Sequence, residues 1–169
     1  RDCLLSRGLG DVYKRQLTIF DAVALAPWGS PFVQHVRRHE AAFATMPAYM
    51  HRALLEAYLQ TAAHLPLAGE AMEIYCTPWL GPVGQPAFYR QIAQMDQSFT
   101  DAVQASYARM DCPVTVLWGE EDAWLPLAQG EALAGLISDG PCIPILGAGH
   151  LVQEDRPEAI VAAVLNRIA

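Results

Sequence analysis

Residues 113–126 read PVTVLWGEEDAWLP, and residues 142–150 read CIPILGAGH. Each stretch begins as a short apolar run, which is typical of a buried strand, and the run stops at a glycine. Each run is followed by a turn that carries an ionisable residue, Asp122 in the first turn and His150 in the second. A helical pattern over residues 127–137 separates the two runs. The order strand, helix, strand predicts two neighbouring parallel strands.

The chain on either side extends this pattern. An apolar run over residues 17–26 predicts another buried strand. Helical patterns follow over about 31–64 and 69–110, and the second is interrupted by a loop predicted at the Pro- and Gly-rich residues 77–86. A last helix is predicted over residues 157–168. We therefore expect an α/β fold in which a long helical insertion separates the first strand from the other two.

Asp122 and His150 follow the carboxyl ends of predicted parallel strands, where functional groups collect in open α/β sheets. A histidine accepts and returns protons near neutral pH. A carboxylate on its other ring nitrogen fixes the tautomer and stabilises the imidazolium. We expect the two side chains to meet. Asp122 also suits an Asx-type turn, and Glu120 or Glu121 remains an alternative acid.

The pattern strand-G-x-x-D-x-x-x-P followed by strand-G-x-G-H resembles the last third of the α/β-hydrolase fold. This resemblance implies that Asp122 is the acid and His150 the histidine of a catalytic triad. Trp124 and Leu151 flank these two residues, and we expect them to contact substrate. Gly147 permits the tight turn that presents the histidine.

The resemblance also implies a domain organisation. Residues 17–27 and 111–169 are expected to form part of an α/β-hydrolase core, and residues 28–110 a helical cap over the active site. The chain is then the C-terminal part of a hydrolase, containing the cap and the last three strands.

The nucleophile of such a triad stands on a strand-to-helix turn with the sequence G-x-S-x-G. No serine in this chain has that frame, so we expect the chain alone to be inactive. The parent protein is expected to hydrolyse a small apolar ester or acyl compound. One alternative is a haloalkane dehalogenase or epoxide hydrolase with an aspartate nucleophile. Another is a non-catalytic ligand-binding module on the same fold.

Residues 1–16 differ in composition from the rest. They contain no alanine, whereas alanine is frequent afterwards, and they contain Lys14, the single lysine of the chain. The string DVYKRQ at residues 11–16 resembles a translated reading frame of a sequencing-library adaptor. We expect residues 1–16 to be a non-native adaptor translation.

Composition limits the function classes further. The 169 residues are 53% hydrophobic with a formal net charge of −7, which favours a globular domain and argues against nucleic acid or anionic membrane as partners. The sequence lacks a spanning apolar run, a signal-peptide pattern and nucleotide-binding motifs, so we expect a cytoplasmic protein without cofactor. The four scattered cysteines are expected to be free thiols. His35 and His39 have i, i+4 spacing but no third ligand, so no metal site is expected.

Overall fold

The computed structural model describes residues 16–67 and 69–168 of the chain. Within this part, strands β1 (Leu17–Phe20), β2 (Val114–Gly119) and β3 (Cys142–Ile145) form a sheet in the order β1-β2-β3. Both pairings are parallel, so the carboxyl ends of the strands lie at one end of the sheet. The predicted α/β fold with a parallel sheet is confirmed.

Strand β1 is shorter than the prediction of residues 17–26. Its pairing with β2 stops at Phe20, opposite Leu117. The next residue, Asp21, has a φ of +40°, which is incompatible with extended backbone. The prediction was therefore wrong for residues 21–26, because the strand ends before Asp21 although residues 22–26 are apolar.

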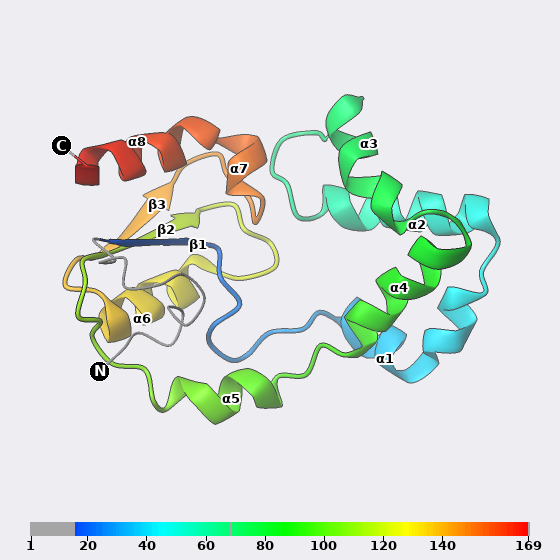
Figure 1. Cartoon of the computed structure of the whole chain (residues 1–169), viewed down its shortest axis with the longest axis horizontal. Coiled ribbons are helices and arrows are strands. Elements are labelled where there is room, and N and C mark those ends of the chain that lie inside the picture. The colour runs from blue at the N-terminus through cyan, green and yellow to red at the C-terminus, as the bar shows by residue number, and fades with distance from the viewer. Residues whose placement is uncertain (1–15, 68, 169) are drawn as a thin grey trace, which may run out of the picture.

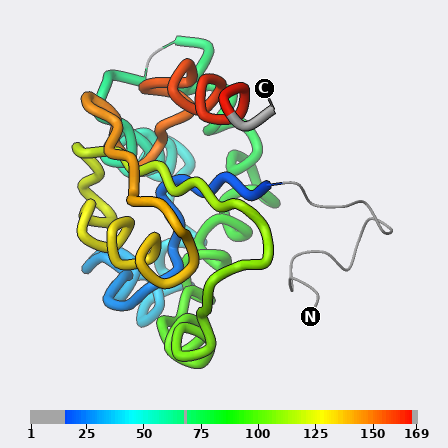
Figure 2. The backbone as a smooth tube through the Cα atoms, turned by 90° about the vertical axis from the view of Figure 1, so that its left-hand side faces the viewer, coloured from blue at the N-terminus to red at the C-terminus, as the bar shows by residue number. Residues whose placement is uncertain are grey.

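Two helices cover the faces of the sheet. Figures 1 and 2 show α6 (Leu127–Ile137) on one side of the strands and α8 (Pro157–Ile168) on the other, and both helices were predicted at these residues. The short helix α7 (Val152–Asp155), which precedes α8, was not predicted. Leu133 and Ile137 of α6 pack against the buried side chain of Trp118 in β2, and burial of this apolar surface stabilises the layered core.

The insertion between β1 and β2 is helical. Its elements are α1 (Pro31–Ala44), α2 (Ala48–Gln60), α3 (Glu70–Cys76), the 3₁₀ turn η2 (Thr77–Trp79), α4 (Gly81–Ala93) and α5 (Ser98–Gln104). Figure 1 shows α1 to α4 grouped beyond the end of the sheet at which β1 leaves it. None of the described helices combines the length and the apolar character needed to cross a membrane.

The prediction of a loop at residues 77–86 was wrong. These residues form η2 and the first part of α4, not a loop. Pro82 lies in the first turn of α4, where its missing N–H has no helical partner to lose. Pro86 removes one internal hydrogen bond. Burial of Phe88 and Tyr89 further along α4 offsets that loss.

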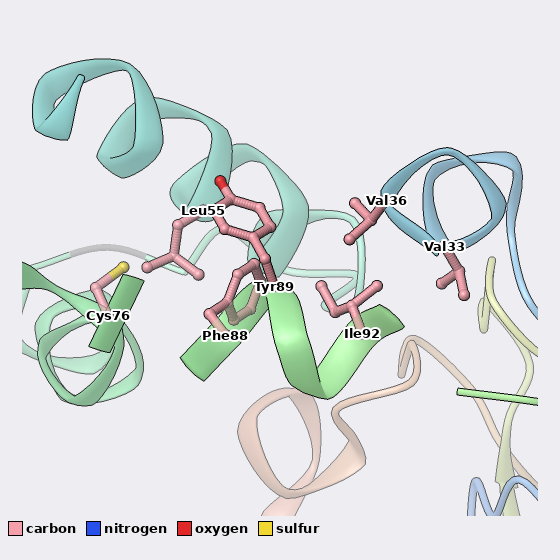
Figure 3. Packing of buried hydrophobic residues seen from close by; sticks show 7 residues of the cluster. All are labelled: Val33, Val36, Leu55, Cys76, Phe88, Tyr89 and Ile92. Carbon is pink, nitrogen blue, oxygen red and sulfur yellow. The ribbon is translucent and has the colours of Figure 1, made fainter. Parts of the chain in front are cut away.

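The helical insertion has an apolar cluster of its own. Figure 3 shows this cap cluster, whose members are Val33, Val36, Leu55, Cys76, Phe88, Tyr89 and Ile92. His51 is buried beside it, where one ring nitrogen lies 2.8 Å from the Tyr89 hydroxyl and the other 2.9 Å from the Trp79 carbonyl oxygen. A second cluster lies between the sheet and α6. The division into a core and a cap at 28–110 stays a prediction.

Candidate active site

The end of the sheet nearest the helical insertion carries three ionisable side chains. Asp21 directly follows β1, Asp122 lies in the turn after β2, and His150 lies in the turn after β3. Parallel pairing places these turns side by side. Contact between residues 28 positions apart in the chain therefore follows from the sheet topology.

The carboxylate of Asp122 uses its two oxygens for different partners. Oδ1 accepts hydrogen bonds from the backbone N–H groups of Trp124 (2.7 Å) and Leu125 (2.9 Å), which makes the turn an Asx-type turn. Oδ2 lies 2.9 Å from Nδ1 of His150. The Asx-turn and acid interpretations are thus compatible, because each needs one oxygen. The side chain is fully buried, whereas the neighbouring residues Glu120 and Glu121 are exposed.

This contact fixes the direction of the His150 ring. A carboxylate only accepts, so Nδ1–H donates to Asp122 and Nε2 is left with its lone pair. No described residue forms a hydrogen bond with Nε2. The side chain keeps 16% of its surface exposed, so a reacting group can approach it. This is the tautomer in which a histidine acts as a general base.

The turn that presents His150 depends on its glycines for two different reasons. Gly147 has a φ of +71°, which a side chain would strain. Gly149 has no such φ, but a Cβ there would lie 2.8 Å from the backbone nitrogen of His64 in the insertion. The histidine turn is therefore packed directly against the residues that follow α2.

A buried carboxylate joins this turn to the insertion. Asp155, in α7, accepts hydrogen bonds from the backbone N–H groups of Gly149 (2.8 Å), His64 (2.9 Å) and Leu65 (2.7 Å). The N–H of Leu151 donates to the carbonyl of Ala62, also in the insertion. The structure gives Leu151 this backbone role and leaves its side chain half-buried.

Aromatic rings form a wall on one side of His150. The Trp124 ring is tilted 32° to the imidazole, with the centroids 5.0 Å apart. Tyr58, from α2, packs against Trp124 with the ring centroids 4.8 Å apart. The Trp124 indole N–H donates to Thr61 Oγ1 and fixes the ring between core and insertion. Tyr58 was not predicted, because nothing in its helical pattern distinguishes it from a packing residue.

Asp21 was also missed by sequence reasoning. It is 6% exposed, and its Oδ1 accepts a hydrogen bond from the Gly119 N–H at 2.9 Å. Burial, and then the negative charge of Asp122, raise the pKa of Asp21 to about 7, although the Gly119 bond and the charge of His150 oppose the rise. The signal was available, since an aspartate closes the apolar run LTIF at the same sheet end as Asp122.

The two histidines of α1, the described cysteines and the hollows of the surface lie outside this site. The rings of His35 and His39 pack together on α1 with their centroids 4.8 Å apart, and no group of three or more ligand-type side chains suited to a metal ion occurs in residues 16–67 and 69–168. A hollow of about 330 Å³ lies beside them, and another of about 450 Å³ lies at the amino end of β2. Neither is lined by Asp122 or His150. Cys76, Cys112 and Cys142 are free, and Cys3 lies outside the described residues.

Comparison with solved structures supports the α/β fold described above. The chain is similar to an alpha/beta hydrolase fold protein from Burkholderia ambifaria, with 56% identity and a TM-score of 0.87, over 90% of this chain and 56% of the other. It also resembles a thermophilic esterase from Thermogutta terrifontis, with 22% identity and a TM-score of 0.56, over 91% of this chain and 55% of the other. The second likeness shows the fold alone. The chain spans about half the length of these proteins.

Comparison of sequences also identifies hydrolase relatives. Over 52 residues, which are 31% of this chain and 19% of the relative, the chain is 36% identical to the uncharacterized hydrolase YugF of Bacillus subtilis (strain 168). A family-wide sequence profile matches residues 5–163, a range that includes part of the predicted adaptor segment; residues 1–15 lie outside the described structure. Since this match extends over most of its length, the chain belongs to the Alpha/beta hydrolase family.

Proposed function

We propose that the protein is a hydrolase in which Asp122 and His150 are the acid and the histidine of a catalytic triad. The 2.9 Å contact between Asp122 Oδ2 and His150 Nδ1 carries this proposal. It leaves Nε2 as a base beside an exposed edge, and it stands at the carboxyl end of a parallel sheet. The nucleophile is proposed to come from a segment that precedes residue 17 in the whole protein.

The chemistry follows from the ring geometry. Nε2 of His150 takes the proton of the nucleophile's hydroxyl as the hydroxyl oxygen attacks the substrate carbonyl. The imidazolium returns that proton to the leaving alcohol when the ester C–O bond breaks. Nε2 then takes a proton from water as the water oxygen attacks the acyl-enzyme carbonyl. The imidazolium returns this proton to the nucleophile's oxygen as the bond from that oxygen to the acyl carbon breaks and the acid product leaves. Asp122 remains ionised throughout and stabilises the imidazolium.

The substrate class is proposed from the aromatic wall. Trp124 presents apolar ring surface beside His150, and Tyr58 packs against Trp124, with no fixed charge on either ring to recognise an ionic group. A small, apolar ester or related acyl compound fits such a surface. Leu151 adjoins the histidine and is proposed to contact the acyl part.

Two alternatives to an esterase remain. The residues that would distinguish them from it are not present in this sequence. In a haloalkane dehalogenase or epoxide hydrolase, the nucleophile is an aspartate and His150 activates only the water. In a binding module, His150 has no chemical role. Sequencing the gene upstream of the Leu17 codon distinguishes the first case. G-x-S-x-G in frame supports an esterase, and G-x-D-x-G transfers the proposal to the aspartate class.

The activity test uses the longer protein encoded by that gene. Hydrolysis of 4-nitrophenyl acetate and butyrate is followed for the wild type, His150→Gln and Asp122→Asn. We expect kcat to fall by on the order of 10³ to 10⁴ in both variants, because the base or its tautomer is lost. His64→Gln is the matched control, since its side chain is exposed. Turnover that survives His150→Gln would refute the proposed role.

A further inference from the structure

Asp21 occupies an unusual position for a carboxyl group. It lies in the interior at the end of β1, 6% exposed, in a backbone conformation with a φ of +40° that residues with a side chain seldom adopt. The Gly119 N–H holds one carboxyl oxygen at 2.9 Å. Strain and burial at the same residue need a compensating interaction.

The second oxygen of Asp21 has no hydrogen-bond partner among the residues that the structure describes. Oδ2 is buried, and no described residue donates a hydrogen bond to it. A buried carboxylate oxygen in this state is costly, whereas a protonated carboxyl becomes a donor and needs only an acceptor. The ionisable groups that act on Asp21 are Asp122 in the turn after β2 and His150 in the turn after β3, while Asp21 itself acts on the Cys142 thiol of β3.

Of these groups, only Asp122 is an acceptor fit for such a proton. Burial raises the pKa of the Cys142 thiol to about 11, so that group stays neutral. His150 already donates to Asp122. Two ionised carboxylates cannot bond to each other, but a single proton between them converts repulsion into a hydrogen bond, and such a bond further raises the pKa of Asp21.

We propose that Asp21 is a positioning residue that holds a proton, donates it as a hydrogen bond to Asp122, and so couples its own ionisation to the charge state of His150. While Asp21 is protonated, the negative charge beside the imidazole is that of Asp122. When Asp21 ionises, a second negative charge appears there and favours the imidazolium. Ionisation of Asp21 is then coupled to the charge on the Asp122–His150 pair.

This inference rests on the proposed Asp122–His150 pair, but its test needs no turnover and uses the same longer protein as the activity test. The carboxyl ¹³C resonance of Asp21 and the imidazole resonances of His150 are followed by NMR from pH 4 to 9. We expect the Asp21 resonance to titrate near pH 7 instead of near its ordinary value of 3.8. We expect the His150 resonances to show a step at the same pH.

The variant Asp21→Asn tests the coupling. Asparagine keeps the acceptor for the Gly119 N–H and stays neutral, so the step that follows Asp21 should vanish from the His150 titration. Asp111→Asn, which removes a carboxylate from an exposed residue, should leave it unchanged.

An Asp21 resonance that titrates near pH 4 in the wild type would overturn the proposal, whether or not the variant folds. So would His150 curves that are identical in the wild type and Asp21→Asn. Coupling without esterase activity in the longer protein would instead count against the proposed function alone.

Discussion

Replacing Asp155 by alanine should reveal how strongly the insertion is joined to the histidine turn. The 4% exposed carboxylate accepts three backbone N–H bonds, from Gly149, His64 and Leu65. Hydrogen bonds to a charged group contribute about 1.5–3 kcal/mol each. His64 and Leu65 are exposed residues whose N–H groups can turn to water, whereas Gly149 is buried. We therefore expect Asp155→Ala to lower the free energy of unfolding by about 3–5 kcal/mol.

The assay combines a global and a local measurement. Urea unfolding followed by tryptophan fluorescence gives the change in free energy. Amide hydrogen exchange reports the three donors individually, and all three should exchange faster in the variant. Glu154→Ala is the matched control, because Glu154 is exposed and accepts one bond, from the Tyr75 hydroxyl. A loss below about 1 kcal/mol with unchanged exchange at Gly149 would contradict this account of Asp155.

Four further predictions concern helix α6 and two ionisable side chains. Gly130→Ala should destabilise the protein by about 1–3 kcal/mol in urea unfolding, because a Cβ would lie 2.5 Å from the Trp118 ring. Gly135→Ala in the same helix meets no neighbour within 4 Å and should stabilise it by up to about 1 kcal/mol. The pKa of Asp21 is about 7 in the folded state and 3.8 in the unfolded state. The free energy of unfolding should therefore fall as the pH rises between these two values. The Asp21→Asn variant should not show this fall. The Cys142 thiol, with a pKa near 11, should react with a thiol reagent at pH 8 only after unfolding.

The sheet, its flanking helices and the meeting of Asp122 with His150 were predictable from local pattern. Both strand runs end at a glycine followed by a turn, and parallel pairing of neighbouring strands brings the two turns together. The end of β1 was not predictable in this way, because residues 22–26 are apolar again after the positive φ of Asp21 ends the pairing. The start of α4 was misjudged for the opposite reason. Pro82 and Pro86 read as loop residues, although tertiary burial stabilises a helix there.

The site residues divide in the same manner. The choice between Asp122 and its neighbours Glu120 and Glu121 depends on which side chain turns inward, and no periodicity encodes this. Tyr58 and Asp155 act through contacts that join segments far apart in the chain. Only the folded arrangement reveals such partners. Asp21 differs, because its place after a strand made it open to the reasoning used for Asp122.

The residues that follow α2 set a limit on modular redesign of this family member. The insertion has its own apolar cluster, so exchanging it for that of another hydrolase looks like a simple graft between residues 28 and 110. Residues 61–65, however, give a hydroxyl to Trp124, a carbonyl to Leu151 and two amides to Asp155. A chimera without this segment would gain a new insertion but lose the hydrogen bonds that hold the turn of His150 in place. Donor caps should therefore be joined on either side of residues 61–65, with those residues kept from the recipient.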